Sequence, residues 1–433
     1  MPEKKHRWII GALVFAIPLH VAMAWYIGRH EGGLLATCWI LLFALYLFVM
    51  YREDAIDIRW LLAFALVYRL LFLFSTPTLS DDIYRYIWDG RLLVEGMNPF
   101  EYLPVDIVGK VEGLDSELLT RLNSPRYYSV YPPGAQFLFW ISAAMSPNSL
   151  IGSILVFRSM VLLVEMGTVF LLLFLAKQYR MHPKNIFWYA LNPLVVIELT
   201  GSLHLEAFMI FFIVLAFALL SIKRNISASG AFALAISVKL LPLMLLPLMI
   251  KRLGVMKSLW FYLFTGAITL ILFIPFLGEP LFRGLGASLG LYYQKFEFNA
   301  GPYFLAREIG YWVQGYNIIQ TAGPYMAVVA GLLIVGYTLY DYRHKMPLAE
   351  AAAMLSCIYF SLSTIVHPWY IVPIIALFSI SQRKLGVVWS FFVFFSYLGY
   401  TSDGFEEVYL VVAIEYLALF LWYYYEWRQL KRL

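Results

Sequence analysis

The chain has 433 residues, of which 62% are hydrophobic and only 14% are charged. Soluble domains are about half apolar and about a quarter charged, so this composition excludes an ordinary soluble enzyme, a disordered chain and a nucleic-acid binder. The two cysteines, Cys38 and Cys357, lie in apolar runs, which excludes a disulfide scaffold. Most of the Lys and Arg behind the formal net charge of +5 sit between apolar runs, as in cytoplasmic loops. We therefore expect a multi-pass integral membrane protein.

The N-terminal part predicts three spans and then a long outer loop. A span needs about 20 apolar residues, and suitable runs cover about 8–28, 33–51 and 59–75. Lys4, Lys5 and Arg7 place the N-terminus in the cytoplasm. Ala22-Met23-Ala24 resembles a signal-peptidase site, but a second span follows at once, so we favour an uncleaved anchor. Residues 76–133 then lie outside.

The outer loop is the longest polar interval of the chain, and loops of this length usually have a function. Its segment 81–95 carries apolar residues at helical spacing and predicts an amphipathic helix along the membrane surface. The following apolar run, 134–145, is too short to span.

The remainder predicts further spans of uneven length. They are about 151–176, 185–200, 205–222, 259–277, 324–340, 348–365, 369–380, 385–400 and 407–422. The interval 227–250 is flanked by basic residues on both sides and is interrupted by Lys239, Pro242 and Pro247. It therefore predicts two short, broken helices that return to the same side.

We expect an all-α polytopic membrane protein of about 12 to 14 spans by the twenty-residue rule. The whole chain, 1–433, forms one membrane domain. It comprises two additional N-terminal spans (1–58), a core (59–375) that contains the outer loop 76–133, and C-terminal spans (376–433).

Ionisable residues near a membrane face a cavity or each other. Here they gather in five segments that the expected topology brings to the outer surface: 81–100, 131–134, 198–206, 239–242 and 367–370. Structural explanations compete for each segment: paired Asp residues often cap a helix, and a histidine beside proline is often structural. Lys239, Arg69 and Arg158 either snorkel toward a headgroup or form a basic site for a lipid phosphate.

The ordered motifs resemble a known family. Ser80-Asp81-Asp82-Ile83-Tyr84-Arg85-Tyr86-Ile87-Trp88-Asp89-Gly90 with Asn98-Pro99-Phe100 is similar to the opening motif of GT-C glycosyltransferases, especially polyprenol-phosphate-mannose-dependent α-mannosyltransferases of lipoglycan synthesis. Tyr131-Pro132-Pro133-Gly134, His204-Leu205-Glu206, Lys239–Pro242 and Pro368-Trp369-Tyr370 resemble later blocks in the same order, over about 60–375. The usual His-Asn-Asp turn reads His204-Leu205-Glu206 here. The resemblance implies a GT-C-like helical bundle with juxtamembrane helices in its first outer loop.

The resemblance also implies transfer of a hexose, mannose being favoured, from a polyprenyl-phosphate donor to a hydroxyl of a glycan or glycolipid. A carboxylate acts as the base in such an inverting reaction. We expect Asp82 to be the base, since related enzymes place the acid four residues before an aromatic residue, here Tyr86, and Asp81 to orient it or to hold a sugar hydroxyl. The expected substrate-binding residues are Tyr84, Arg85, Tyr86, Trp88, Asp89, Arg91, Asn98, Tyr131, His204, Glu206, Lys239, His367, Trp369 and Tyr370.

Lys239 and His367, with an arginine such as Arg85 or Arg91, are expected to hold the donor phosphate. Asp81, Asp82, Glu198 and Glu206 could hold a divalent ion, but the cations can neutralise a monophosphate instead, so we expect no obligatory metal or other cofactor. The expected partners are the donor, the acceptor and membrane lipids, without nucleic acid. The expected location is the bacterial inner membrane, with the site facing the periplasm.

Two other classes of function compete with this interpretation. A transporter or flippase of a lipid-linked saccharide would also have many spans, but it should show repeats and polar groups near the midplane. A polysaccharide polymerase or ligase would also use a large outer loop and a lipid-linked donor, but it would lack an Asp-Asp motif directly after a span.

Overall fold

The computed structural model describes residues 2–52, 56–344 and 346–430 of the chain. Among these residues the fold is helical, and the strands are limited to the antiparallel pair β1 (Tyr400–Thr401) and β2 (Gly404–Phe405). The α-helices are α1 (Pro2–Trp25), α2 (Gly32–Met50), α3 (Ile58–Leu70), α4 (Asp82–Val94), α5 (Pro104–Ile107), α6 (Ser116–Thr120), α7 (Pro133–Met145), α8 (Leu150–Gln178), α9 (Phe187–Ala190), α10 (Pro193–Val195), α11 (Glu206–Ser221), α12 (Asn225–Val238), α13 (Met249–Leu253), α14 (Val255–Phe273), α15 (Glu279–Gln294), α16 (Gly301–Gln314), α17 (Ile319–His344), α18 (Leu348–Ser361), α19 (Val372–Phe378), α20 (Leu385–Val393) and α21 (Tyr409–Leu430). Shorter helical segments are the 3₁₀ turns Pro183–Ile186, Leu241–Leu248, Ile274–Phe276, Pro368–Ile371 and Phe394–Gly399, and the π-helical turn Val196–Gly201.

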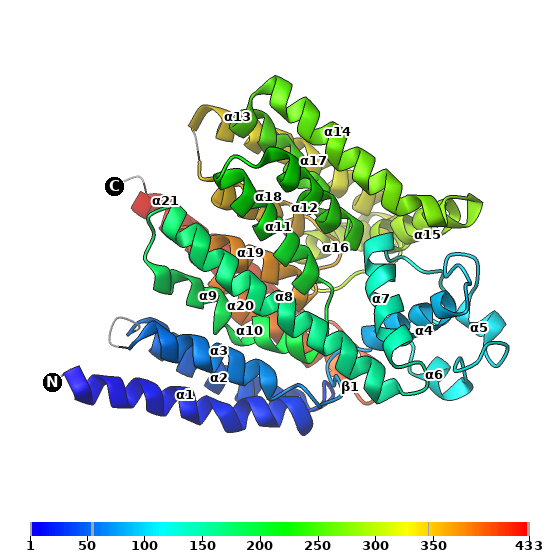
Figure 1. Cartoon of the computed structure of the whole chain (residues 1–433), viewed down its shortest axis with the longest axis horizontal. Coiled ribbons are helices and arrows are strands. Elements are labelled where there is room, and N and C mark those ends of the chain that lie inside the picture. Colours follow the sequence, from blue (N-terminus) through cyan, green and yellow to red (C-terminus); the bar gives the residue numbers. More distant parts are fainter. Residues whose placement is uncertain (1, 53–55, 345, 431–433) are drawn as a thin grey trace.

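The long helix α8 lies between the N-terminal helices and the rest of the bundle (Figure 1). The N-terminal helices α1, α2 and α3 lie together along one side, and α4 to α7 form a separate lobe at the right of the view (Figure 1). Helix α8 packs against α11, which forms a closely packed pair with α12. The two chain ends lie on the left of the same view, away from the lobe (Figure 1).

Several helices have the length and composition of membrane spans. His6–Trp25, Gly32–Met50, Leu150–Gln178, Val255–Phe276 and Ile319–His344 are long and apolar enough, and a sixth span results if the bent pair Pro193–Gly201 and Glu206–Ser221 is counted as one. Four further apolar helices are shorter: Asn225–Val238, Leu348–Ser361, Pro368–Phe378 and Leu385–Gly399. The all-α polytopic class is therefore confirmed. The described residues hold five or six helices of spanning length, fewer than the 12 to 14 spans expected, because the other apolar runs fold into shorter or broken helices.

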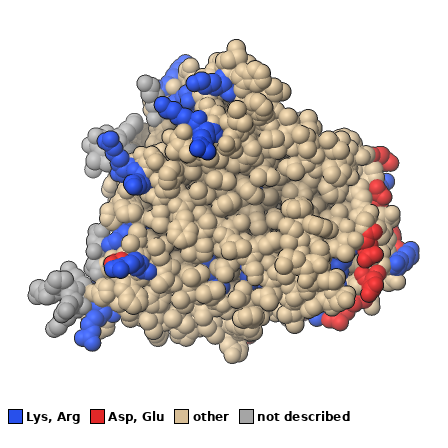
Figure 2. Space-filling view, viewed as in Figure 1, with Lys and Arg blue, Asp and Glu red and all other residues tan. Residues whose placement is uncertain are grey.

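Charge divides the surface into two ends. Lys and Arg gather at the top and left of the view, near α13 and the termini, whereas Asp and Glu gather at the right edge over the α4–α7 lobe (Figure 2). The acidic end includes the exposed residues Asp106, Glu112, Asp115 and Glu117. A broad band with few charged residues separates the two ends, as expected of a surface that faces lipid (Figure 2).

The segment 81–95 forms the predicted helix, but its predicted environment is wrong. Every residue of α4 from Ile83 to Leu92 is buried, so the helix lies inside the α4–α7 lobe instead of presenting one face to the membrane surface. Its closest approach is to α7, where a Cβ on Gly90 would come within 2.3 Å of the Phe139 carbonyl oxygen. Only glycine allows this contact, which explains why two helices of mixed polarity can pack so tightly.

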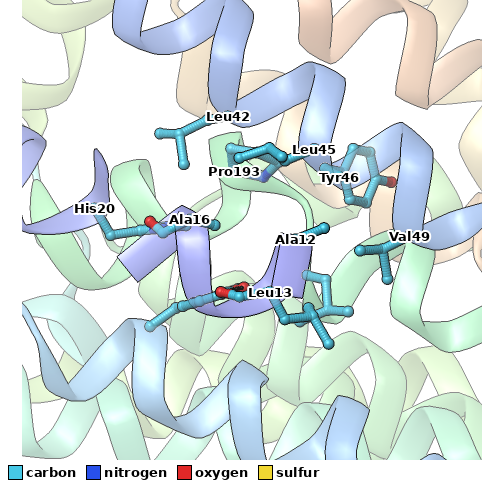
Figure 3. Close-up of a pocket in the computed structure, with 11 residues that line it drawn as sticks. Ala12, Leu13, Ala16, His20, Leu42, Leu45, Tyr46, Val49 and Pro193 are labelled. Atoms are coloured by element: carbon cyan, nitrogen blue, oxygen red, sulfur yellow. Dashed lines mark hydrogen bonds between the residues drawn. The ribbon is translucent and has the colours of Figure 1, made fainter. Parts of the chain in front are cut away.

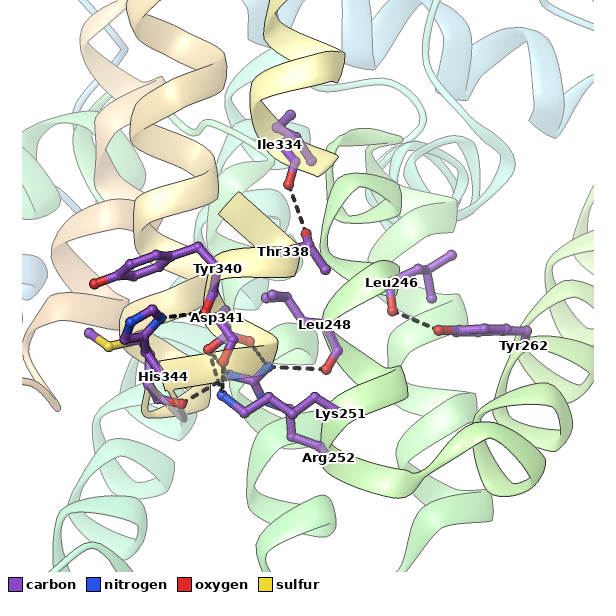
Figure 4. Close-up of polar contacts among 11 residues, drawn as sticks. Leu246, Leu248, Lys251, Arg252, Tyr262, Ile334, Thr338, Tyr340, Asp341 and His344 are labelled. Atoms are coloured by element: carbon purple, nitrogen blue, oxygen red, sulfur yellow. Dashed lines mark hydrogen bonds and ion pairs between the residues drawn. The ribbon is translucent and has the colours of Figure 1, made fainter. Parts of the chain in front are cut away.

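The interval 227–250 is broken as predicted. Helix α12 ends at Val238 and is followed by Lys239, whose backbone is extended, and then by the 3₁₀ turn Leu241–Leu248 and α13. At the end of this return, Lys251 donates to Asp341 Oδ1 on α17 at 2.8 Å, and Arg252 donates to both Asp341 oxygens (Figure 4). Arg252 also interacts electrostatically with Tyr179, the residue that follows α8. Tyr179 lies beside the basic cluster that starts at Lys177. The segment therefore starts and ends beside basic residues.

A small pocket lies between the N-terminal helices. Residues of α1, α2 and α3 line it together with Leu191 and Pro193, and its walls are mostly apolar (Figure 3). His20 lies at its edge, stacked on Tyr68 with ring centroids 4.2 Å apart. None of the substrate-binding residues expected from the sequence lines this pocket.

Candidate functional site

Asp82 lies at the start of α4 and faces residues from two distant segments. Its Oδ1 accepts a hydrogen bond of 2.7 Å from Asn123 Nδ2, and its Oδ2 lies 3.6 Å from His204 Nδ1. Its backbone N–H donates to Ser80 Oγ at 3.3 Å. The carboxylate keeps 19% of its side-chain surface exposed. It is thus held in place and still accessible from outside the protein.

Burial raises the pKa of Asp82, which lies outside the membrane spans, from 3.8 to about 6. The hydrogen bond from Asn123 and the charge of Lys239 act in the opposite direction, whereas the carboxylates of Glu206 and Asp81 add to the increase. A carboxylate with a pKa near 6 is deprotonated at neutral pH and accepts a proton more readily than an ordinary aspartate. These are the properties required of a general base.

Glu206 and Lys239 form the opposite part of the site. Lys239 Nζ forms an ion pair with Glu206 Oε1, which joins the first residue of α11 to the end of α12. The ammonium also lies 4.3 Å from the centroid of the Tyr370 ring. Lys239 remains 30% exposed, whereas Glu206 is only 2% exposed. The cation is therefore the accessible member of the pair.

A stack of rings connects the histidines of the site. The His204 ring lies on Trp369 with centroids 3.7 Å apart, and Trp369 lies on His367 at 4.3 Å. His367 in turn contacts Phe298 at 4.3 Å. His367 Nδ1 has no hydrogen-bond partner within the part of the chain that the structure describes. The stack fixes both imidazoles, and this buried nitrogen is left without a partner among the described residues.

The segment that carries Glu198 and His204 has an unusual backbone. Val196–Gly201 is a π-helical turn, and Leu203 has a positive φ of 66°. Such features cost free energy and concentrate at functional sites. Arg158 on α8 is fully buried and donates to Thr200 O at 2.9 Å and to Gly201 O at 3.1 Å. It also donates to Ser75 O, so it ties the π-helical turn to the chain that leads into Asp81.

This position of Arg158 resolves one of the alternatives left open by the sequence. Arg69 is fully buried as well: it donates to Glu165 Oε2 at 3.0 Å and to Ala190 O at 2.8 Å. Neither arginine reaches a headgroup or is accessible to a lipid phosphate. Both bind carbonyl oxygens or a carboxylate inside the protein, which is a structural role.

Asp81 is bound by a residue of the N-terminal helices. Arg29, in the turn between α1 and α2, forms a 2.6 Å ion pair with Asp81 Oδ2. The guanidinium also lies 5.2 Å from the centroid of the Tyr400 ring on β1. Arg29 is 24% exposed, so a cation from the first loop of the chain lies at the edge of the site.

Two of the expected aromatic residues extend the site toward α7. The rings of Tyr86 and Tyr131 meet edge to face with centroids 5.1 Å apart, and Tyr86 stacks on Phe139 at 4.4 Å. Burial raises the pKa of Tyr86, and the negative charges of Asp82 and Glu206 add to this increase. Tyr84, in contrast, packs beneath Arg121, whose guanidinium lies 5.6 Å from its ring centroid.

Other expected substrate-binding residues have structural contacts. Arg85 donates to Asp89 Oδ1 at 2.7 Å and to Tyr127 O at 2.9 Å, and Asp89 also accepts from Ser129 and Gln136. Arg91 donates to Gly113 O, Trp88 is fully buried, and Asn98 caps a turn through Phe100 N at 3.1 Å. These side chains fix the outer loop against α4. Their direct role in substrate binding stays a prediction.

Four contributors to the site escaped the sequence analysis, and a fifth, Glu198, was considered there only as a possible metal ligand. Arg29, Asn123, Tyr397 and Tyr400 carry no motif and come from loops or helices far from Asp82 in the chain. Glu198 lies in a polar turn that the sequence did single out, yet only the π-helical turn directs it at His204. Among the described residues, no group of three or more His, Cys, Asp or Glu is arranged to hold a metal ion.

The fold and the site define a multi-pass helical membrane protein with a carboxylate-bearing polar site beside its α4–α7 lobe. Residues 7–254, more than half of the chain, match the model of the family described as alpha-(1->6)-mannopyranosyltransferase, N-terminal domain. The chain therefore belongs to this family, and the resemblance noted from its motifs is confirmed. The match starts at residue 7 and so includes the two N-terminal helices that the sequence analysis treated as additional.

Individual relatives are distant. Alpha-(1->6)-mannopyranosyltransferase A of Mycobacterium tuberculosis is 28% identical over 216 residues, which are 47% of this chain and 40% of that protein. Alpha-(1->6)-mannopyranosyltransferase B of Corynebacterium glutamicum is 25% identical over 147 residues, or 34% of this chain and 24% of that protein. The alignments thus span less than half of each relative's length.

Proposed function

We propose that this protein transfers mannose from a polyprenyl-phosphate donor to a hydroxyl of a glycan or glycolipid at the outer face of the membrane. The observation that carries the proposal is the environment of Asp82: a partly exposed carboxylate, held by Asn123, with its pKa raised by burial to about 6. Family membership and the names of the relatives support mannosyl transfer rather than transport of a saccharide.

In the proposed reaction, the acceptor oxygen forms a bond to the anomeric carbon as the bond from that carbon to the phosphate oxygen breaks. The electron pair of the broken bond leaves on the phosphate, and the hydroxyl proton goes to Asp82. This displacement inverts the anomeric centre and needs one carboxylate base. No residue needs to form a covalent bond to the sugar, and the neighbouring carboxylate of Asp81 remains bound to Arg29.

The donor phosphate binds between Lys239 and His367 in this proposal. Lys239 offers an accessible ammonium, and His367 offers an unpartnered ring nitrogen. Of the arginines, Arg29 is better suited to assist than Arg85 or Arg91, because its guanidinium lies at the edge of the site whereas theirs bind the outer loop. The cations Lys239 and Arg29 stabilise the charge that develops on the leaving phosphate, and His367 can contribute as a neutral hydrogen-bond donor.

The charge distribution supports an outward orientation. The basic end near α13 corresponds to a cytoplasmic surface by the positive-inside rule, and the acidic α4–α7 lobe then lies in the periplasm of a bacterial cell (Figure 2). Polyprenyl-phosphate sugars carry their headgroup at the membrane surface, so the donor would enter the site from the lipid. No metal is required in this mechanism.

A direct assay tests the proposal. The purified full-length protein in lipid nanodiscs is incubated with radiolabelled polyprenyl-phosphate mannose and an α-linked oligomannoside, with polyprenyl-phosphate glucose as a matched donor control. We expect label in the oligomannoside from the mannose donor, in the α configuration by NMR. Movement of a lipid-linked saccharide across proteoliposomes without formation of a new glycosidic bond would favour the transporter class instead.

A further inference from the structure

Glu198 and His204 form a buried pair behind Asp82. His204 Nε2 lies 3.3 Å from Glu198 Oε2, and the other ring nitrogen, Nδ1, lies 3.6 Å from Asp82 Oδ2. Glu198 is fully buried and His204 is 1% exposed. Neither Glu198 Oε2 nor His204 Nε2 has a hydrogen-bond partner in the part of the chain that the structure describes. Their mutual approach of 3.3 Å is therefore the polar contact that could satisfy both atoms.

Glu198 is poorly placed to be an anion. Its Oε1 accepts a 2.9 Å hydrogen bond from Tyr397, but none of the described arginines or lysines forms an ion pair with it. The charged groups near it are the carboxylates of Glu206 and Asp82, which disfavour a negative charge on Glu198. A buried carboxylate without a cation is costly and keeps its proton instead. A protonated Glu198 donates to His204 Nε2, which requires the ring proton to be on Nδ1.

We infer that Glu198 is a positioning residue: it fixes the His204 tautomer whose Nδ1–H donates to Asp82 and holds the carboxylate toward the acceptor hydroxyl. The approach of 3.6 Å becomes a hydrogen bond after a small rotation of the Asp82 carboxylate, and catalytic hydrogen bonds are often long before substrate binds. The stack of His204 on Trp369 fixes the plane of the ring, and Arg158 fixes the π-helical turn. This inference rests on the proposed function, since it assigns a role through the base of that reaction.

Three variants test the inference by steady-state kinetics. Glu198→Gln keeps a donor toward Nε2 and an acceptor for Tyr397, so it should retain kcat within about threefold, whereas Glu198→Ala should lower kcat by about 10- to 100-fold with little change in the donor KM. The double variant Asp82→Asn/Glu198→Ala should be no slower than Asp82→Asn alone, because Glu198 acts only through Asp82.

Glu165→Ala is the matched control. Glu165 is also fully buried and accepts a tyrosine hydroxyl, that of Tyr189, but its other partner is Arg69 instead of His204. This variant should lower the Tm and leave kcat per folded molecule unchanged. Wild-type kcat in Glu198→Ala, equal losses in Glu198→Gln and Glu198→Ala, or a further loss in the double variant would each overturn the inference.

A measurement without turnover separates this inference from the proposed function. The ¹⁵N spectrum of histidine-labelled protein, with the His204 signals assigned by their loss in His204→Gln, should show a protonated Nδ1 and an unprotonated Nε2. A protonated Nε2 would overturn the inference even if mannose is transferred. Conversely, an absence of transfer by the wild-type protein would remove the proposed function but leave the tautomer result standing.

Discussion

Asp341 and Asp82 are two carboxylates in contrasting environments. Asp341 is fully buried near α13 and accepts hydrogen bonds from Lys251 and Arg252 (Figure 4). Asp82 is partly exposed, accepts from the neutral amide of Asn123 and lies near two further carboxylates. The first environment neutralises a charge and holds two helices together. The second keeps a carboxylate without a contacting cation, which is costly for stability but makes it a better base.

The largest difference between the two should appear on removal of their charge. Asp82→Asn should lower kcat by about 10²–10⁴-fold, because a general base contributes about that much. Asp341→Asn should leave kcat per folded molecule unchanged but reduce stability by about 2–4 kcal/mol, because two partly buried cations lose their counter-charge. The measurements are mannosyl transfer and thermal unfolding of the same preparations.

Asp81→Asn is a second control, with a smaller expected loss because the Asp81 carboxylate is already paired with Arg29. If Asp82→Asn turned over normally and Asp81→Asn were inactive, the assignment within the pair would be reversed. If Asp341→Asn lost activity without losing stability, the contrast between the two regions would be incorrect.

Lys239→Met should raise the KM for the polyprenyl donor by about 10- to 100-fold, since a hydrogen bond to a charged group contributes about 1.5–3 kcal/mol. The acceptor KM should change much less. Lys257→Met is the matched control, because this exposed lysine on α14 lies outside the site and should leave both KM values unchanged. Unchanged donor dependence in both Lys239→Met and His367→Ala would exclude these residues from the phosphate site and leave the arginines.

The smallest expected effect is the pH dependence. In the proposed reaction the deprotonated form of Asp82 is the base, so kcat/KM should fall as the pH drops through about 6 and should be about tenfold lower at pH 5 than at pH 8. The raised pKa has the opposite consequence for stability: the contribution of Asp82 is present below pH about 4 and is lost as the pH rises through about 6. Asp82→Asn should therefore fold well at neutral pH. An acid limb centred near pH 4 would contradict the unusual environment of this carboxylate.

Much of this arrangement was predictable from the sequence. Apolar runs identified the long helices, and the paired Asp residues, the His204-Leu205-Glu206 turn, Lys239 and the 368–370 block were expected to meet, as they do. The breaks were harder to predict. A run of apolar residues does not reveal that 185–201 divides into several short turns, because the carbonyl contacts of Arg69 and Arg158 that fix this path are tertiary.

The roles of the arginines show the same limit. Arg85 and Arg91 belong to the motif and were expected at the phosphate, yet they bind carbonyls of the outer loop. Arg29 belongs to no motif and reaches Asp81 because the turn between α1 and α2 lies beside β1. Composition places a cation in the chain, but only the packing of distant segments decides which carboxylate or carbonyl it meets.

The contact of His30 with the β1–β2 hairpin has a consequence for biogenesis. His30 Nδ1 lies 2.8 Å from Thr401 O, beside the Arg29–Tyr400 contact, and Tyr397 holds Glu198. The first loop to leave the ribosome thus cannot form this contact until residues some 370 positions later have been synthesised. Membrane insertion proceeds from the N-terminus, so a nascent chain can place its early helices but cannot complete the site before the hairpin emerges. Premature termination shortly before Tyr400 would therefore leave a protein that is inserted but inactive.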